Sequence, residues 1–266
     1  MRKISIFTAV MAMAVMALVL SADLAGAAII QVDIQSSGSN NGGGVTQSGW
    51  NAWALSESFN TTAHSTNFAY APTTGGNLGV SITPTTNAGA RNYGLSNISD
   101  PVNLANPNVW YDQYFTNAIT TGATMTVALS NLKAGIYQFT SYHYANDLSI
   151  DGGATGVSNE GIASVFLNTG SGYTDTGMDV TFTSGLNSAG SRNLSAAQVM
   201  TDGTFTTSFT VANDNDSISI RYQDITDADS FGLNGFEVAL IPEPSSGLLL
   251  LGATAALGLL RKKLHG

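Results

Sequence analysis

GIYQFTSYHY, residues 135 to 144, is the stretch that decides the fold, because its side chains alternate in kind from one residue to the next. Successive side chains of an extended chain point to opposite faces. Tyr137, Phe139 and Ser141 therefore share one face, and the residues between them share the other. The pattern predicts a strand with one face on a core and the other in water.

The rest of this half of the chain repeats the pattern. Further strands are expected at TMTVALSNL (124–132), ASVFLNT (163–169), MDVTFTS (178–184), GTFTTSFTVA (203–212), SISIRYQD (217–224) and GFEVALI (235–241). Residues with strong turn preferences, such as Asn213-Asp214-Asn215-Asp216, separate them. No segment shows a sustained helical period. The second half of the chain therefore indicates an all-β fold.

The first half is less regular. Strands are expected at QVDIQ (31–35), GWNAW (49–53) and LGVSITP (78–84), with a loop at residues 36–44 and an aromatic cluster at residues 108–115. No internal repeat or linker divides the body. Residues 28–240 are therefore predicted to form one antiparallel two-sheet β-sandwich, jelly-roll-like, flanked by a signal helix and a C-terminal hydrophobic helix.

The first 27 residues have the three parts of a secretory signal peptide. These are a basic start at Arg2 and Lys3, a following apolar stretch, and the small residues Ala25-Gly26-Ala27. The alternative is an uncleaved N-terminal membrane anchor. We expect cleavage after Ala27, with Ala25 and Ala27 as the small residues of the site, and export of the remaining chain.

Between residues 28 and 241 the chain is strongly acidic. Once Asp23 and Glu243 are set aside, sixteen of the 18 acidic residues lie there against four basic ones, which gives a net charge of −12. Such a surface repels phosphate backbones, so nucleic acid is excluded as a partner. The chain has no cysteine, so the body must fold on its core alone, with calcium as a candidate aid.

The C-terminal segment IPEPSSGLLLLGATAALGLLRKKLHG, residues 241 to 266, joins an apolar run to a basic stop. The fourteen uncharged residues from Gly247 to Leu260 fall short of the ~20 that span a bilayer as a helix. Pro242 and Pro244 prevent a helix from extending upstream. A core helix ending in three cations is excluded. A retained membrane anchor and an export address that is removed both stay open.

The same segment resembles the PEP-CTERM sorting signal of Gram-negative bacteria. The three parts of that signal stand in order as Pro242-Glu243-Pro244, the apolar stretch 246–260, and Arg261-Lys262-Lys263. The resemblance implies that exosortase, a membrane transpeptidase, recognises residues 241–266 while the C-terminal helix holds the chain at the membrane. It also implies delivery to the cell envelope, the outer surface or an extracellular polysaccharide matrix.

The body carries a second resemblance. LKAGIYQFTSYHY (132–144), SISIRYQD (217–224) and SFGLNGFEV (230–238) are similar to galactose-binding-like jelly rolls, and LNGFEV as a closing strand carries most of the likeness. The resemblance implies a jelly-roll fold. Function has to be argued from a site, because one fold serves many functions.

Aromatic side chains are candidates for binding sugar, because pyranose rings stack on exposed Trp and Tyr. The alternative is that these side chains fill the core, as most Trp and Tyr side chains do. Two of the tryptophans are three residues apart, so they face opposite ways in a strand and at least one could be core. The candidates are Trp50, Trp53, Trp110, Tyr111, Tyr142 and Tyr144.

Carboxylates gather on both sides of the predicted strand 217–224. Calcium binds six to eight oxygens, which carboxylates, Asn side chains and loop carbonyls supply. Neither ANDNDS (212–217) nor DITDADS (224–230) matches an EF-hand loop, and turn formation is the alternative role. The candidate calcium ligands are Asp33, Asp214, Asp216, Asp224, Asp227, Asp229 and Glu237.

Catalytic motifs are missing from the sequence. It contains neither G-x-S-x-G nor H-E-x-x-H, and His143, four residues before Asp147, is the only histidine of the body near an obvious acid. We therefore expect no enzyme. The sequence predicts an exported, non-catalytic surface or matrix protein that binds polysaccharide, with a purely structural or adhesive role and a glycoside-processing enzyme as alternatives.

Overall fold

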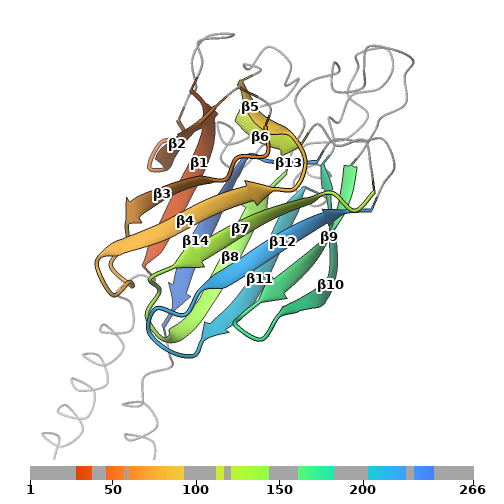
Figure 1. The fold of residues 1–266 in the computed structure, drawn as a ribbon. Coiled ribbons are helices and arrows are strands. Elements are labelled where there is room, and N and C mark those ends of the chain that lie inside the picture. The colour runs from red at the N-terminus through yellow and green to blue at the C-terminus, as the bar shows by residue number, and fades with distance from the viewer. Residues whose placement is uncertain are drawn as a thin grey trace, which may run out of the picture.

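The computed structural model describes residues 28–37, 46–56, 58, 60–92, 112–116, 121–143, 161–182, 203–225 and 231–242. Within these ranges every helix-or-strand element is a strand, and fourteen strands are present. Most of them belong to two sheets that pack face to face (Figure 1). The all-β, two-sheet sandwich expected from the sequence is thus confirmed for this part of the chain.

The first sheet has five strands in the order β11-β8-β14-β1-β2. Strand β1 brings the beginning and the end of the body together, because Ile29 pairs with Ala239 and Asp33 pairs with Gly235. Strands β1 and β2 run parallel, so the expectation of purely antiparallel sheets is corrected at this pair. The strands are β1 (Ile29–Ser36), β2 (Asn51–Leu55), β8 (Gly135–Tyr142), β11 (Thr204–Val211) and β14 (Gly235–Ile241).

The second sheet has six strands in the order β10-β9-β12-β7-β4-β3, and all its pairs are antiparallel. Its outer face is turned toward the viewer in Figure 1. The strands are β3 (His64–Ala69), β4 (Asn77–Pro84), β7 (Thr124–Ser130), β9 (Gly161–Asn168), β10 (Tyr173–Phe182) and β12 (Ile218–Asp224).

A small third sheet lies at the upper end of the sandwich in Figure 1. It pairs β13 (Gly232–Leu233) with β6 (Asp112–Thr116) and β6 with β5 (Ala88–Asn92). Strands β5 and β6 also contact β1 of the five-stranded sheet. The small sheet therefore covers this end of the core.

The core lies between the two large sheets and follows the alternation of the sequence. On β8, Tyr137 and Phe139 are fully buried, and Phe139 stacks on Phe236 of the neighbouring β14. On β12, Ile218, Ile220 and Tyr222 are likewise fully buried. Burying these large side chains is the main favourable term in folding a chain that has no disulfide.

Both termini of the described domain leave from the five-stranded sheet. Strand β1 begins beside the end of β14, so Ala28 and Pro242 lie at the same end of that sheet, the lower end in Figure 1. The predicted signal segment, with Ala25 and Ala27, lies outside the described residues, as do Glu243, Pro244 and the cations 261–263. No helix within the described ranges is long and apolar enough to cross a membrane.

Candidate functional site

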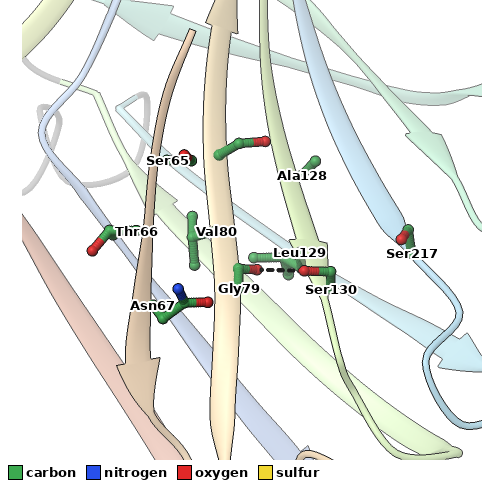
Figure 2. A pocket seen from close by; sticks show the side chains of 10 residues that line it. Ser65, Thr66, Asn67, Gly79, Val80, Ala128, Leu129, Ser130 and Ser217 are labelled. Atoms are coloured by element: carbon green, nitrogen blue, oxygen red, sulfur yellow. Dashed lines mark hydrogen bonds between the residues drawn. The ribbon is translucent and has the colours of Figure 1, made fainter.

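A groove crosses the outer face of the six-stranded sheet (Figure 2). It encloses about 410 Å³ and runs over β3, β4 and β7 toward the start of β12. We call this feature the groove. It is lined by Ser65, Thr66, Asn67, Gly79, Val80, Ser81, Ala128, Leu129, Ser130 and Ser217.

The groove exists because small residues occupy the outward positions of neighbouring strands. The register aligns Ser65 with Ser81 and Ser81 with Ala128, so three small side chains follow one another across three strands. Val80 and Leu129 point into the core, so only their backbone contributes to the floor. Because these outward side chains are small, the surface of the sheet is recessed at this place.

Gly79 leaves room for the Ser130 side chain where β4 meets β7. A Cβ atom at this position would lie 2.3 Å from Oγ of Ser130, much closer than real contacts allow. The space is taken by the Ser130 hydroxyl, which donates a hydrogen bond of 3.3 Å to the Gly79 carbonyl (Figure 2). The glycine thus allows a polar side chain to lie flat across the strand at the bottom of the groove.

The chemistry of the groove is neutral and polar. Its side chains offer hydroxyl groups and the Asn67 amide, which both donate and accept hydrogen bonds. The hydroxyl groups of Ser65, Ser81 and Ser217 bond to no other side chain within the described residues. The lining contains no carboxylate, histidine or cysteine. The groove can bind a ligand rich in hydroxyl groups, and among its lining residues the serine hydroxyls have no histidine or carboxylate beside them to act as a base.

The tryptophans expected to form a sugar platform are packing residues. Trp53 of β2 is 6% exposed and meets Phe68 of the opposite sheet edge to face, with 6.1 Å between ring centroids. Trp50 is 8% exposed and packs on Tyr142, with 5.7 Å between centroids. Neither indole presents a ring face to solvent, so the expectation of an exposed platform at these two residues is corrected.

Of the four remaining aromatic candidates, the structure describes only Tyr142. Tyr142 is half-buried, and its hydroxyl donates a 2.6 Å hydrogen bond to Oε1 of Glu237 on β14. This bond ties together two side chains that the sequence assigned to different sites. Trp110, Tyr111 and Tyr144 lie outside the described residues, so their proposed contact with sugar stays a prediction.

The candidate calcium ligands are spread over the molecule. Asp33 lies on the five-stranded sheet and Asp224 at the end of β12 in the other sheet. Asp214 and Asp216 bond the backbone amides of Ala134 and Asn213, at 2.8 and 2.9 Å, and so stabilise turns. Asp227 and Asp229 lie outside the described residues.

The described carboxylates therefore do not fit a calcium ion as a set. Within the described ranges no group of three or more Asp, Glu, His or Cys side chains is close enough to hold a metal. The physical reason is topological, since Asp33 and Asp224 belong to different sheets, and Glu237 is occupied by Tyr142.

Asp33 is a buried acid with an unusual environment. Its Oδ2 accepts a 2.7 Å hydrogen bond from the backbone amide of Gln47, while Oδ1 is buried and has no partner among the described residues. Burial raises the pKa of Asp33 from 3.8 to about 7, and the Gln47 amide and the Gln35 side chain only partly offset this. Asp33 therefore behaves as a neutral or half-ionised group near neutral pH.

His143 lies in a chain of hydrogen bonds inside the sandwich, not in a cleft. Its Nδ1 is 2.6 Å from the Gly232 carbonyl and its Nε2 is 2.8 Å from the Ser141 hydroxyl, which in turn accepts from Tyr222. Burial lowers the pKa of His143 from 6.5 to about 3, so the ring is neutral. All three side chains are fully buried, which gives them a structural role.

Sequence reasoning missed the groove. Ser65 and Asn67 fall in β3, a strand that the Thr- and Ser-rich sequence did not indicate. Gly79, Ser81, Ala128 and Ser130 fall in strands that were expected, but as ordinary outward positions. The sequence does show that these outward positions carry small residues. Only the strand register shows that the small residues lie next to one another.

Comparisons with known proteins give structural likenesses only, since no family model and no curated protein matches the chain. A family 35 carbohydrate-binding module from Clostridium thermocellum is similar over 66% of this chain and 97% of its own, with 8% identity and a TM-score of 0.32. CBM35 from Paenibacillus barcinonensis covers the same shares, with 11% identity and a TM-score of 0.31. TmCBM61, solved with β-1,4-galactotriose, is 11% identical over 62% of this chain and 88% of its own, with a TM-score of 0.29. At such scores and identities, function has to follow from the residues of this chain.

Proposed function

We propose that this protein is a non-catalytic polysaccharide-binding protein and that the groove is its binding site. The observation that carries the proposal is the hollow lined by hydroxyl and amide groups on an open sheet face. A polyhydroxylated chain can exchange its hydrogen bonds with water for bonds to Ser65, Asn67 and Ser81.

The two alternative functions predicted from the sequence, an enzyme and a purely structural protein, make different demands on the groove. A glycoside-processing enzyme needs two carboxylates about the scissile bond, and none lines the groove. A purely structural protein needs no groove at all. The low floor made by Gly79 and Ala128 therefore favours binding.

The proposal includes export and delivery to the cell envelope or matrix, supported by the signal-like N-terminus and the C-terminal sorting motif. The geometry is compatible with tethering. Ala28 and Pro242 leave from the five-stranded sheet, whereas the groove lies on the outer face of the other sheet. A tail held at a membrane leaves the groove accessible to a surrounding polysaccharide.

The experiment is a binding assay with the full chain in detergent against a panel of soluble glycans and the exopolysaccharide of the producing cell. We expect binding to at least one polysaccharide and its loss in Ser81→Phe, which fills the middle of the groove. Aromatic residues are favoured in strands, so this variant is expected to fold. Absence of binding by the unmodified chain to every glycan would contradict the proposal.

A further inference from the structure

Three large side chains rise from the six-stranded sheet beside the groove. They are Phe166 of β9, Tyr173 of β10 and Arg221 of β12. The guanidinium carbon of Arg221 lies 4.7 Å from the centroid of the Phe166 ring and 4.1 Å from that of Tyr173. Contacts of this kind hold an arginine through its face and leave the edge of the guanidinium, which carries the N–H donors, for other partners.

Arg221 has no acidic partner within the described residues. Its Nε is buried without a hydrogen-bond acceptor, and no described carboxylate forms an ion pair with the side chain. The two aspartates of the edge strand β10, which is separated from β12 by β9, accept hydrogen bonds from residues near them. Asp175 accepts from the amide of Gly177 at 2.8 Å, and Asp179 accepts from the Ser164 hydroxyl at 2.7 Å.

Among the described residues, then, Arg221 is held by two aromatic rings and forms no ion pair with a carboxylate. In proteins an arginine commonly pairs with a carboxylate. The two rings fix the position of the guanidinium, but they do not accept hydrogen bonds from its N–H groups as a carboxylate would. The guanidinium keeps its charge, and its terminal N–H groups, as distinct from the buried Nε, have the chemistry that binds a carboxylate.

The register connects this arginine to the groove. Ser217, which lines the groove, directly precedes β12, and Ser219 and Arg221 follow at alternate positions within that strand. Ser219 pairs with Ala128 of the groove on one side and with Asn168 on the other, and Asn168 pairs with Tyr173. Neighbouring strands are about 4.8 Å apart, so one row of side chains leads from the groove to the Tyr173 ring within a few strand spacings.

We propose that the groove takes an acidic polysaccharide and that Arg221, held against Phe166 and Tyr173, binds the carboxylate of one of its sugar units. The inference rests on the proposed function, since the same polymer lies in the groove. Tyr173 is 39% exposed and offers part of its ring to the acidic sugar. The acidic surface of the protein repels anions at a distance, so the contact with Arg221 has to supply the preference.

The test compares a uronic acid polymer with the same polymer after its carboxylates are reduced to alcohols. The full chain, in detergent, is expected to bind the acidic form at least tenfold more tightly at low salt, and added salt should shrink this ratio. Arg221→Gln should bring the ratio close to one, because it should weaken binding of the acidic polymer far more than binding of the reduced polymer. Arg221→Lys, which keeps the charge but loses the fork, should retain a smaller preference.

The outcomes separate this inference from the proposed function. Equal affinity of the unmodified chain for both polymers would overturn the role of Arg221 and leave the groove as a neutral site. An unchanged ratio in a folded Arg221→Gln protein would overturn it as well. If the chain binds neither polymer nor any other glycan, the proposed function fails, and this inference with it. Ser81→Phe should weaken binding of both forms, which distinguishes the groove from the arginine.

Discussion

The hydroxyl of Ser141 lies 2.8 Å from Nε2 of His143, between the two sheets and away from solvent. Tyr222 donates to this hydroxyl at 2.7 Å, so the Ser141 proton points to Nε2, and Nδ1–H donates to the Gly232 carbonyl. Each donor therefore has an acceptor when the imidazole is neutral. The chain of bonds links β8 and β12 across the core and holds the first residue of β13, Gly232, against His143.

Acid should destabilise the protein through His143. The folded-state pKa of His143, about 3, lies below its usual 6.5, so the unfolded chain binds a proton first as the pH falls. The stability that the neutral ring contributes is present above about pH 6.5 and is lost between there and pH 3. Denaturant unfolding of the unmodified protein and of His143→Gln at several pH values should show this loss as a difference between the two proteins that shrinks as the pH falls, because Asp33 contributes equally to both. His143→Gln should be less stable at pH 7 but should lose this component of the pH dependence.

Asp33 should have the opposite effect on the pH dependence of stability, because it should destabilise the protein as the pH rises. Its folded-state pKa is raised from 3.8 to about 7, so the unfolded chain releases its proton first as the pH rises. Stability is therefore lost between about pH 4 and pH 7, by up to about 4 kcal/mol since one pKa unit is worth about 1.4 kcal/mol. Asp33→Asn, which stays neutral, should match the unmodified protein at pH 4 and exceed it at pH 8. Equal stability at pH 8 would contradict the buried environment of this acid.

Trp53 should matter for stability and not for binding. Its indole fills space between the sheets against Phe68, so Trp53→Ala should cost about 3–5 kcal/mol in the free energy of unfolding. Trp50→Phe, which keeps an aromatic ring against Tyr142, should fold and bind glycan with unchanged affinity. A tenfold loss of glycan affinity in folded Trp50→Phe would restore the indole platform that the burial argues against.

Substitutions at Gly79 and Ser130 should have non-additive effects on the free energy of unfolding. In Gly79→Ala the new methyl group meets the Ser130 hydroxyl, so we expect a loss of about 1–3 kcal/mol in stability. Ser130→Ala removes that oxygen, and its own cost should be near 1 kcal/mol because one hydrogen bond to the Gly79 carbonyl is lost. The double variant should be more stable than the sum of the single effects predicts. Additive effects in this double-mutant cycle would contradict the close contact.

The alternation of apolar and polar residues along the sequence predicted individual strands and their buried faces. The alternation around Tyr137 and Ile220 follows from the two-residue period of a strand, so both strands and their buried faces could be predicted. Strand β3 could not be predicted, because only Phe68 among its six residues is a buried apolar side chain. The parallel pair of β1 and β2 depends on long-range contacts that no local pattern reports.

The candidate site was harder to predict than the fold. Trp50 and Trp53 have the right chemistry for a sugar platform, but packing decides whether an indole is exposed. The clustered aspartates 214 and 216 have turn roles that satisfy their oxygens locally. The groove, in contrast, is made of residues with no individual signal, brought together from β3, β4, β7 and the start of β12 by strand order.

The affinity of two phenylalanine variants for the bound polysaccharide tests the central claim most directly. Ser81→Phe places a ring in the groove, and Ser208→Phe places the same ring on the outer, exposed side of β11 in the other sheet. Calorimetric titration should give at least tenfold weaker binding for Ser81→Phe and unchanged binding for Ser208→Phe, with both proteins folded. Equal affinity of the two variants would show that the groove is not the binding site.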